Sequence, residues 1–383
     1  MKFELTLPNY EHCILNTITS ILKYYKVNTP HSTLPSLDSI LNSHKYKNIV
    51  FLVLDGLGEH IYKPITNNGF FSRYQLETLT SVFPSTTTAA LTTYYSGKPP
   101  YETGWIAWSQ YFKEYGRSID MLKHTESYKN DSLNGSKIDV FQSVVNYETI
   151  FNQIENASTI NAYEITPSYS DKRSKRSLTA DNIDELIDHI KLLCNNPEEK
   201  FVFAYCDEPD HSLHKYGTNS AEVQELILSF ENKIEYLSES LPNDTLLIIS
   251  ADHGHLNIED SHSILDYPEL QECMYMPASL ESRALTFWIK EDKKQVFEER
   301  FNRLFKGKFL LISKAEFLEK NFLGFGTKHS KIDDFLGNYV AISISSSIIR
   351  LETYLAEGKP IKKSTHCGLT KNEMEVPLII YSK

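Results

Sequence analysis

The stretch 48–58, NIVFLVLDGLG, runs through six apolar residues in succession before it reaches Asp55 and two glycines. Apolar character that is continuous, rather than alternating, indicates a strand covered on both faces, as in a parallel sheet. The same pattern, a buried strand that ends in an acidic turn, recurs at residues 200–217 (KFVFAYCDEPDHSLHKYG) and 244–255 (DTLLIISADHGH). Residues 374–382 (MEVPLIIYS) supply a further strand.

Helical patterns lie between these strands. Residues 221–241 (AEVQELILSFENKIEYLSESL) carry apolar side chains at steps of three and four, which is the period of an amphipathic helix. Strands that alternate with helices predict an α/β fold with a mostly parallel central sheet flanked by helices. Ligands of such folds gather at the carboxyl ends of the strands, which is where the polar turns of this sequence fall.

Two stretches depart from this alternation. Residues 104–155 are rich in aromatic and polar side chains and include a loop-like run at 123–137 (KHTESYKNDSLNGSK). Residues 260–350 contain apolar runs and the amphipathic segment 293–305 (KKQVFEERFNRLF), which predicts a smaller α/β cap. Because no Pro- or Ser-rich linker separates the pieces, we expect insertions rather than a string of domains. We therefore predict a catalytic core at 1–255 and 351–383, an inserted cap at 256–350, and a possible active-site-proximal insertion within the core at 104–155.

The composition limits the classes of function. A formal net charge of −11 over 383 residues argues against a duplex nucleic-acid binder, which needs a basic surface. The five cysteines are odd in number and show no CxxC spacing, so we expect a reducing compartment and a cytoplasmic protein. The first residues lack the pattern of a signal peptide, and no apolar run approaches the ~20 residues of a membrane span, so no membrane partner is expected. The composition does not indicate an oligomeric state.

Six side chains at the predicted strand ends carry the chemistry. They are three carboxylates and three imidazoles: Asp55, Asp210, Asp252, His214, His253 and His366. Oxygen and nitrogen ligands of this kind suit two zinc ions, with manganese as the alternative, better than calcium or an iron–sulfur cluster. Two Zn²⁺ ions with three carboxylates and neutral histidines leave a cationic site, which would attract a phosphate group.

Three consecutive threonines precede a run of small residues at 83–97 (FPSTTTAALTTYYSG). If this run is a helix, the threonines lie at its N-terminus, where free N–H groups favour an anion. A hydroxyl held against a metal loses its proton readily and can attack phosphorus. The pattern therefore indicates a threonine nucleophile at a two-metal phosphoryl-transfer site.

The order of these motifs resembles the alkaline phosphatase superfamily, and it looks most like the type I phosphodiesterase/nucleotide pyrophosphatase branch. The resemblance runs from about residue 48 to 380, and its motifs are Asp55, 83–97, EPDHSLHKYG at 208–217, SADHGH at 250–255 and THCGLTKNEMEVPLII at 365–380. It implies an alkaline-phosphatase-like core and a small phosphorylated substrate, nucleotide-like in this branch.

The resemblance also implies the roles of single residues. Thr87 would be the nucleophile, and Asp55, Asp252 and His253 would hold one zinc together with it. Asp210, His214 and His366 would hold the other zinc. A phosphothreonine intermediate and retention of configuration at phosphorus would follow. One departure is Ala90, which stands where the branch commonly carries an asparagine that binds a phosphoryl oxygen; a backbone N–H around Thr88 is a candidate replacement.

Several neighbours of these residues have more than one interpretation. Thr86 and Thr88 are alternative nucleophiles, although helix capping and packing are the roles expected for them. His211 and His255 are expected on the surface or behind the ligands, and Glu208 is a candidate partner for a ligating histidine. The aromatic residues of 105–112 (WIAWSQYF) belong either to a stacking surface or to the core.

The sequence thus predicts a metal-dependent hydrolase of phosphodiester or pyrophosphate bonds. A phosphomonoesterase, a phosphonate hydrolase and a phosphomutase on the same core are alternatives. A non-catalytic binding module is the alternative from another class.

Overall fold

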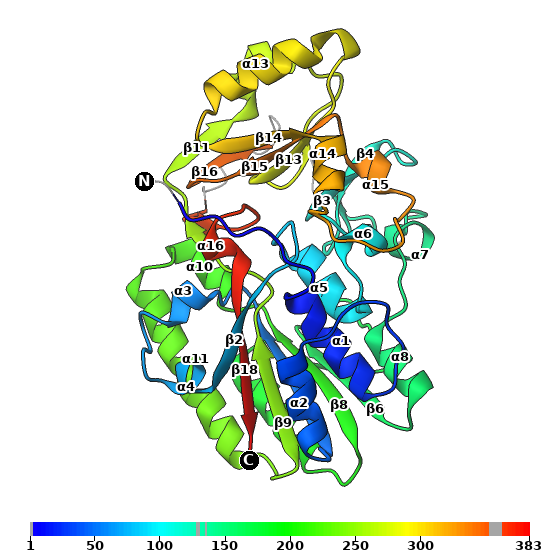
Figure 1. Cartoon of the computed structure of the whole chain (residues 1–383), viewed down its shortest axis with the longest axis vertical. Coiled ribbons are helices and arrows are strands. Elements are labelled where there is room, and N and C mark those ends of the chain that lie inside the picture. Colours follow the sequence, from blue (N-terminus) through cyan, green and yellow to red (C-terminus); the bar gives the residue numbers. More distant parts are fainter. Residues whose placement is uncertain (1–2, 128–130, 135, 352–361) are drawn as a thin grey trace.

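The computed structural model describes residues 3–127, 131–134, 136–351 and 362–383, and it contains two seven-stranded sheets (Figure 1). Some residues of two predicted segments lie outside the described residues. They are 128–130 and 135 of the loop-like run and 352–361 of the last core segment. One of these sheets forms the lower part of the molecule in Figure 1, and the other lies above it.

The first sheet has the strand order β2-β18-β9-β1-β8-β6-β7. Its strands are β1 (Asn48–Leu54), β2 (Gln75–Thr80), β6 (Asn161–Thr166), β7 (Arg176–Thr179), β8 (Lys200–Cys206), β9 (Thr245–Ser250) and β18 (Glu375–Ser382). The central strand β1 pairs in parallel with β8 and β9, and every residue of these three strands is buried. The last strand, β18, is antiparallel to both β9 and β2. The prediction of a mostly parallel, doubly covered sheet is confirmed.

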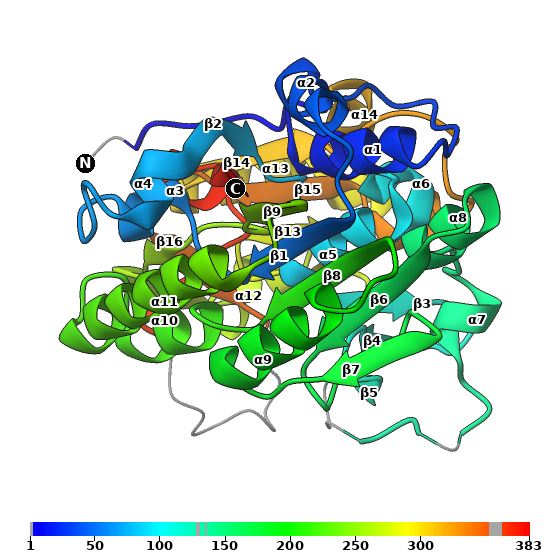
Figure 2. The ribbon, with the colours of Figure 1, turned by 90° about the horizontal axis from the view of Figure 1, so that it is seen from below.

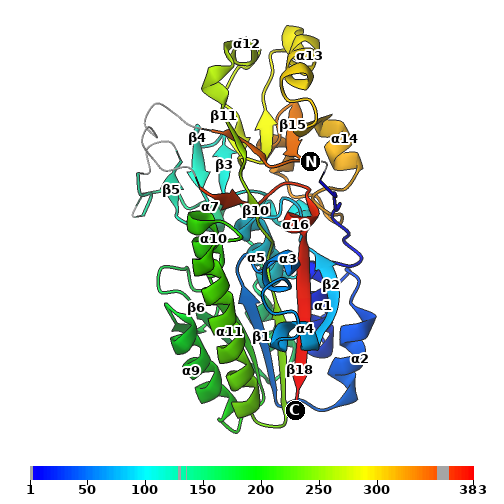
Figure 3. The same ribbon diagram turned by 90° about the vertical axis from the view of Figure 1, so that its left-hand side faces the viewer.

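Helices cover both faces of this sheet, so that Figure 3 shows three layers. One face carries α9 (Ile183–Cys194) and α11 (Ala221–Ser240), which pack against each other. The other face carries α1 (Ile14–Tyr24), α2 (Pro35–Ser43), α5 (Thr87–Ser96) and α8 (Ile150–Ala157), as the view from below confirms (Figure 2). In α11 the buried side chains follow the predicted helical period, and Ser220 caps the first turn through the Val223 N–H.

The second sheet has the order β14-β15-β13-β12-β3-β4-β5. Its strands are β3 (Ser109–Phe112), β4 (Arg117–Asp120), β5 (Thr125–Glu126), β12 (Ser279–Leu280), β13 (Ala284–Phe287), β14 (Phe309–Ser313) and β15 (Tyr339–Ser343). The helix α13 (Lys294–Leu304) packs on β14, with Phe297 and Phe301 in the core. Strands from 109–126 and from 279–343 thus join in one sheet, although the sequence analysis treated the two stretches as separate insertions. The domain boundaries themselves stay a prediction.

Short elements complete the described chain. The helices are α3 (Glu59–Tyr62), α4 (Phe70–Tyr74), α6 (Pro100–Thr103), α7 (Val140–Ser143), α10 (Asp210–Tyr216), α12 (Pro268–Gln271), α14 (Lys314–Glu319), α15 (Ile332–Phe335) and α16 (Lys371–Met374). Two-stranded pairs join β10 (Leu256–Asn257) with β17 (Ser364–Thr365) and β11 (Asp260–Ser263) with β16 (Ser347–Arg350). All five cysteines are free and buried. Among the described residues, no helix combines the length and apolarity needed to cross a membrane.

Candidate active site and metal centre

The predicted site residues follow the ends of neighbouring strands, as the sequence analysis expected. Asp55 comes directly after β1, and Asp252 and His253 follow β9. Asp210 opens α10 a few residues after β8, and His366 follows the short strand β17. Because β1, β8 and β9 are parallel neighbours, these ends meet at one edge of the sheet, below the second sheet.

One group of side chains surrounds Thr87. The Thr87 hydroxyl oxygen lies 3.4 Å from Asp55 Oδ2 and 3.2 Å from His253 Nε2. His253 Nε2 also lies 3.3 Å from Asp55 Oδ1 and 3.4 Å from Asp252 Oδ2. Asp55, Asp252 and His253 each offer a ligand atom within 4.8 Å of the others, so one metal ion could contact all three. This is the predicted first ligand set.

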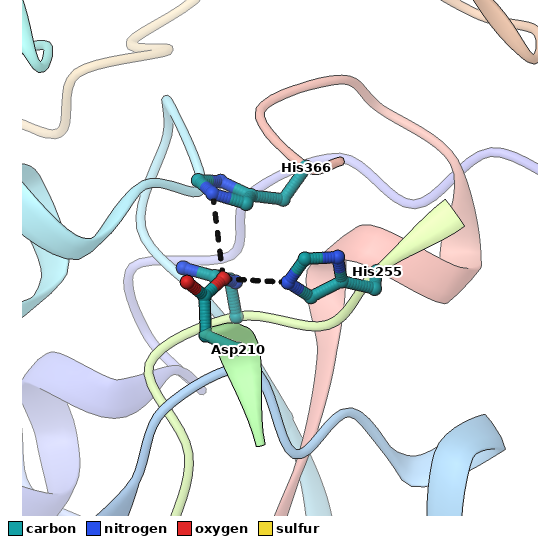
Figure 4. Close-up of side chains that lie close together, drawn as sticks. Asp210, His255 and His366 are labelled. Atoms are coloured by element: carbon teal, nitrogen blue, oxygen red, sulfur yellow. Dashed lines mark hydrogen bonds and ion pairs between the residues drawn. The ribbon is translucent and has the colours of Figure 1, made fainter. Parts of the chain in front are cut away.

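A second group surrounds Asp210. Its Oδ1 lies 2.6 Å from His255 Nε2, 3.4 Å from His214 Nε2 and 3.7 Å from His366 Nε2. Figure 4 shows the carboxylate of Asp210 between the rings of His255 and His366. The ligand atoms of Asp210, His253, His255 and His366 lie within 4.8 Å of one another. The His253 and His366 rings stack with centroids 3.7 Å apart and so join the two groups.

The contact of His255 with Asp210 was not predicted. The sequence analysis expected His255 behind the ligands, yet its imidazole is fully buried and is the nearest of the three to Asp210. His214, which was predicted as a ligand, lies 3.4 Å from Asp210 Oδ1 and packs its ring against those of His255 and His366, and Lys362 Nζ lies 2.9 Å from its Nε2. The second group therefore offers one imidazole more than the predicted set.

The imidazoles share one orientation. In each ring Nδ1 faces an oxygen: the Ser364 carbonyl for His214, the Gly254 carbonyl for His253, the Ser364 hydroxyl for His255 and the Ser85 carbonyl for His366. A carbonyl oxygen only accepts, so Nδ1 carries the proton in His214, His253 and His366. The Ser364 hydroxyl donates to the Leu213 carbonyl and therefore accepts from Nδ1 of His255. In each ring the Nε2 lone pair points at the carboxylates. This is the arrangement of histidines that bind a metal through Nε2.

Burial sets the protonation of the site. Burial, followed by repulsion from Asp252 and Asp210, raises the pKa of Asp55 well above its usual value. Burial also raises the pKa of Asp252, although His253 opposes it. For Asp210 burial acts to raise the pKa, but His214, His255 and His366 outweigh it and hold that pKa well below its usual value. Acidic groups that repel one another in a buried site need a cation to remain charged.

Burial keeps three of the four imidazoles neutral. Burial lowers the pKa of His214 to about 4 and of His255 to about 3, in both cases against the attraction of Asp210. Burial, then repulsion from His253, lowers the pKa of His366 well below its usual value. Neutral imidazoles are the form that binds a metal.

Two carboxylate oxygen atoms of the first group indicate that the site fits a metal ion. Asp55 Oδ1 and Asp252 Oδ2 are buried and have no hydrogen-bond partner among the described residues. An unpaired carboxylate oxygen in a protein interior is costly, whereas a divalent cation satisfies it. Together with the Nε2 lone pairs, these atoms form a donor set that suits zinc or manganese.

The run after the threonines, for which the sequence analysis considered a helix, forms α5. The first intrahelical hydrogen bond of α5 joins the Ala90 N–H to the Thr86 carbonyl at 2.9 Å. The N–H groups of Thr87, Thr88 and Ala89 come before it and have no carbonyl partner within the helix. Ala90 itself is fully buried and offers no side-chain donor. Thr86 occupies the N-cap position but forms no capping hydrogen bond through its side chain. Its hydroxyl instead donates to Glu281 Oε1 at 2.9 Å, which the sequence analysis did not anticipate.

Three expectations about neighbouring residues can be compared with the structure. Glu208 accepts hydrogen bonds from the N–H and hydroxyl of Ser212, so it is not the partner of a ligating histidine. His211 is exposed, as expected. Trp105 is buried and donates its indole N–H to the Val145 carbonyl at 2.8 Å, so it belongs to the core.

Two tyrosines behind the site were missed by the sequence analysis. Tyr205, near the end of β8, donates its hydroxyl to Asp55 Oδ2. Tyr94, on α5, places its hydroxyl 2.8 Å from the Ala251 carbonyl oxygen and 3.2 Å from the Ser250 hydroxyl oxygen. Tyr205 stood within an apolar run and Tyr94 within a helix, and a lone hydroxyl in such runs signals nothing until its partner is known.

Tyr94 ties α5 to the strand end that precedes Asp252. We expect Tyr94→Phe to lower the free energy of unfolding by about 1–2 kcal/mol, because a buried carbonyl loses its donor. Urea denaturation followed by far-UV circular dichroism measures the change. Tyr236→Phe is the matched control, since Tyr236 is 61% exposed and its loss of a hydroxyl should change little. Equal stabilities of the two variants would contradict the expectation.

The fold is shared with solved structures of low sequence identity. Murine ectonucleotide pyrophosphatase/phosphodiesterase 5 aligns with a TM-score of 0.62 and 16% identity, over 88% of this chain and 88% of that chain. An inactive variant of that murine protein in complex with AMP aligns with a TM-score of 0.61. Phosphonoacetate hydrolase from Sinorhizobium meliloti 1021, in complex with phosphonoformate, aligns with a TM-score of 0.65 and 14% identity, over 88% and 90% of the two chains.

Sequence comparisons agree with the fold. The catalytic subunit of GPI ethanolamine phosphate transferase 3 from Homo sapiens is 31% identical over 75 residues. This segment is 19% of the chain but 7% of that human protein, so the chain spans a small part of this relative's length. The profile of the family described as type I phosphodiesterase/nucleotide pyrophosphatase matches residues 49–300, well over half of the chain. The chain therefore belongs to the type I phosphodiesterase/nucleotide pyrophosphatase family.

Proposed function

We propose that this protein is a metal-dependent phosphodiesterase or nucleotide pyrophosphatase that uses Thr87 as its nucleophile and two zinc ions. The position of the Thr87 hydroxyl carries the proposal. That hydroxyl lies at the N-terminus of α5, 3.2 Å from His253 Nε2 and 3.4 Å from Asp55 Oδ2. Family membership and the two clusters of candidate ligands support the proposal.

The chain's own residues would divide the work between the two groups. Asp55, Asp252 and His253, with Thr87, would hold one ion, and Asp210, His214 and His366 the other. When bound, the ions would supply positive charge that lowers the pKa of the nucleophile and neutralises the phosphoryl oxygens. The free N–H groups at the start of α5 would add donors for a phosphoryl oxygen, in the place of the asparagine that Ala90 replaces.

The reaction would proceed in two displacements. In the first, the Thr87 oxygen attacks phosphorus while the bond from phosphorus to the leaving oxygen breaks, which gives a phosphothreonine. In the second, water attacks the phosphothreonine and releases the threonine hydroxyl. Two inversions give overall retention at phosphorus. The proposed substrate is a small phosphorylated molecule, and the AMP complex of the murine structure makes a nucleotide a reasonable first choice.

A phosphonate hydrolase is the second candidate, because the fold aligns with phosphonoacetate hydrolase as well as with the ectonucleotide enzyme. The fold alone does not separate these chemistries. Phosphomonoesterase and phosphomutase activity on the same core are further alternatives, and a cytoplasmic location stays a prediction.

An assay with and without metal tests the proposal. We expect the zinc-loaded protein to hydrolyse bis(p-nitrophenyl) phosphate faster than p-nitrophenyl phosphate or phosphonoacetate. A chelator should abolish turnover, and added zinc should restore it, with metal content followed by elemental analysis. Preference for phosphonoacetate would favour the second candidate. Absence of turnover by metal-loaded protein on every ester would support a binding module instead.

A further inference from the structure

A carboxylate from the second sheet lies beside the proposed nucleophile and has no role in the mechanism above. Glu281 Oε1 accepts hydrogen bonds from the Thr86 hydroxyl at 2.9 Å and from the Trp108 backbone N–H at 2.5 Å. Thr86 directly precedes Thr87, and consecutive Cα atoms are only ~3.8 Å apart. The second sheet thus brings a carboxyl group into contact with the residue that directly precedes the proposed nucleophile.

The local backbone is built to deliver this side chain. Glu281 lies in the tight turn between β12 and β13, where its N–H bonds to the Ala284 carbonyl at 3.1 Å. The preceding residue, Leu280, has a φ of 83°, which non-glycine residues rarely adopt. Such a conformation persists only where the surrounding structure enforces it, and it is found mainly at functional sites.

Two hydrogen bonds hold one oxygen of the Glu281 carboxyl group. The Trp108 N–H can only donate, and the described residues provide partners for Oε1 but not for Oε2. Burial has the largest effect and raises the pKa of Glu281 above its usual value, although the Trp108 N–H, the Thr86 hydroxyl and Lys362 act in the opposite direction, so an alkaline pH favours the carboxylate form. Asp120 adds a further negative charge from β4. Oε1 of Glu281 therefore has two donors, whereas Oε2 is left to accept a hydrogen bond from a substrate or to repel a negatively charged one.

We propose that Glu281 is a specificity-determining residue that disfavours dianionic phosphate monoesters and favours diesters, above all diesters with a cationic or hydrogen-bond-donating group. This inference rests on the proposed function, since it places the substrate beside Thr87. A monoester carries a second negative charge that a diester lacks, and repulsion in a buried site is only weakly screened. A charge that weakens the binding of one substrate class changes which substrate is preferred and not how fast the preferred substrate reacts.

The test compares three esters with the zinc-loaded protein at one alkaline pH. They are p-nitrophenyl phosphate, which is a dianion, bis(p-nitrophenyl) phosphate, which is a monoanion, and p-nitrophenyl phosphorylcholine, whose diester carries a cation. In Glu281→Gln we expect kcat/KM for the monoester to rise at least about tenfold relative to the bis-diester. The preference for the choline ester over the bis-diester should fall. The amide oxygen of glutamine can still accept from Thr86 and Trp108, so the fold is retained.

Asp120→Asn is the matched control, because it removes one negative charge from the same sheet without a hydrogen bond to Thr86. It should leave both ratios within about twofold of the wild type. Unchanged ratios in Glu281→Gln, or an equal change in Asp120→Asn, would overturn the inference.

A binding measurement separates this inference from the proposed function. Calorimetric titration of the zinc-loaded protein with inorganic phosphate should show about tenfold tighter binding to Glu281→Gln than to the wild type, whether or not either protein turns over. Tighter binding without hydrolysis of any ester would reject the hydrolase and keep the role of Glu281. Equal phosphate affinities together with normal hydrolysis would keep the hydrolase and reject the role of Glu281.

Discussion

Replacement of Thr87 by alanine is expected to lower kcat by about 10⁴-fold or more while the zinc content stays close to that of the wild type. The hydroxyl is the attacking atom in the proposed mechanism, whereas the carboxylates and imidazoles around it remain in place. Asp55, Asp252 and His253 already lie within 4.8 Å of one another through their ligand atoms, so they should retain the metal without the threonine. Single-turnover kinetics together with elemental analysis measure both quantities in one preparation.

The neighbouring threonines serve as controls for this experiment. Thr88→Ala removes a buried hydroxyl that has no hydrogen-bond partner among the described residues, so its kcat should stay within about threefold of the wild type. Thr87→Ser keeps an attacking oxygen and should retain part of the rate. A large fall in kcat for Thr88→Ala together with a normal kcat for Thr87→Ala would identify Thr88, and not Thr87, as the nucleophile.

Those parts of the fold that depend on burial could be predicted from the sequence. The runs that became β1, β8 and β9 are almost continuously apolar, and this pattern is typical of strands covered on both faces. Since parallel strands end at a common edge, the acids and histidines that follow them were expected to converge, and the structure brings them together. The helix α5 was likewise predictable from its small residues and the threonines before it.

Features that depend on distant contacts could not be predicted. The apolar run of β18 does not reveal its direction, and it is antiparallel to both neighbours. The pairing of β3 with β12 joins residues that lie far apart in the sequence. His255 looked like a neighbour of a ligand, because only the folded chain brings it to Asp210. Thr86 was expected to cap its own helix, yet its partner Glu281 is contributed by the other sheet.

A buried ion pair fixes the loops that hold the histidines. Arg283 Nε and Nη2 donate to the two carboxylate oxygens of Glu373 at 2.6 and 2.7 Å, and both residues are fully buried. Glu373 Oε1 also accepts from the Gly368 N–H at 2.7 Å, two residues beyond His366. Its backbone carbonyl accepts from the Gly254 N–H at 2.9 Å, between His253 and His255. One glutamate therefore links the second sheet to both histidine loops.

We expect Glu373→Ala to lower the free energy of unfolding by about 3–5 kcal/mol, because it leaves the Arg283 guanidinium buried without its carboxylate. Zinc affinity should fall about 10–100-fold, since the loop of His366 loses the hydrogen bond from the Gly368 N–H to the Glu373 carboxylate, whereas the backbone contact to Gly254 remains. Chemical denaturation of the metal-free protein measures the first effect, and competition with a chelator measures the second. The double variant Glu373→Ala/Arg283→Ala should lose less than the sum of the two single variants.

An exposed ion pair provides the matched control for the Glu373 experiment. Lys45 and Glu199 lie 2.5 Å apart with 80% and 44% of their side chains exposed, and Glu199→Ala should leave the free energy of unfolding almost unchanged. The contrast follows from solvation, because water replaces the lost partner of Lys45 but cannot reach Arg283. If Glu373→Ala were as stable as Glu199→Ala and bound zinc as tightly as the wild type, the pair would be neither a structural tie nor a support of the histidines. A loss of zinc affinity without a loss of stability would confine the role of the Glu373 carboxylate to holding the His366 loop in place.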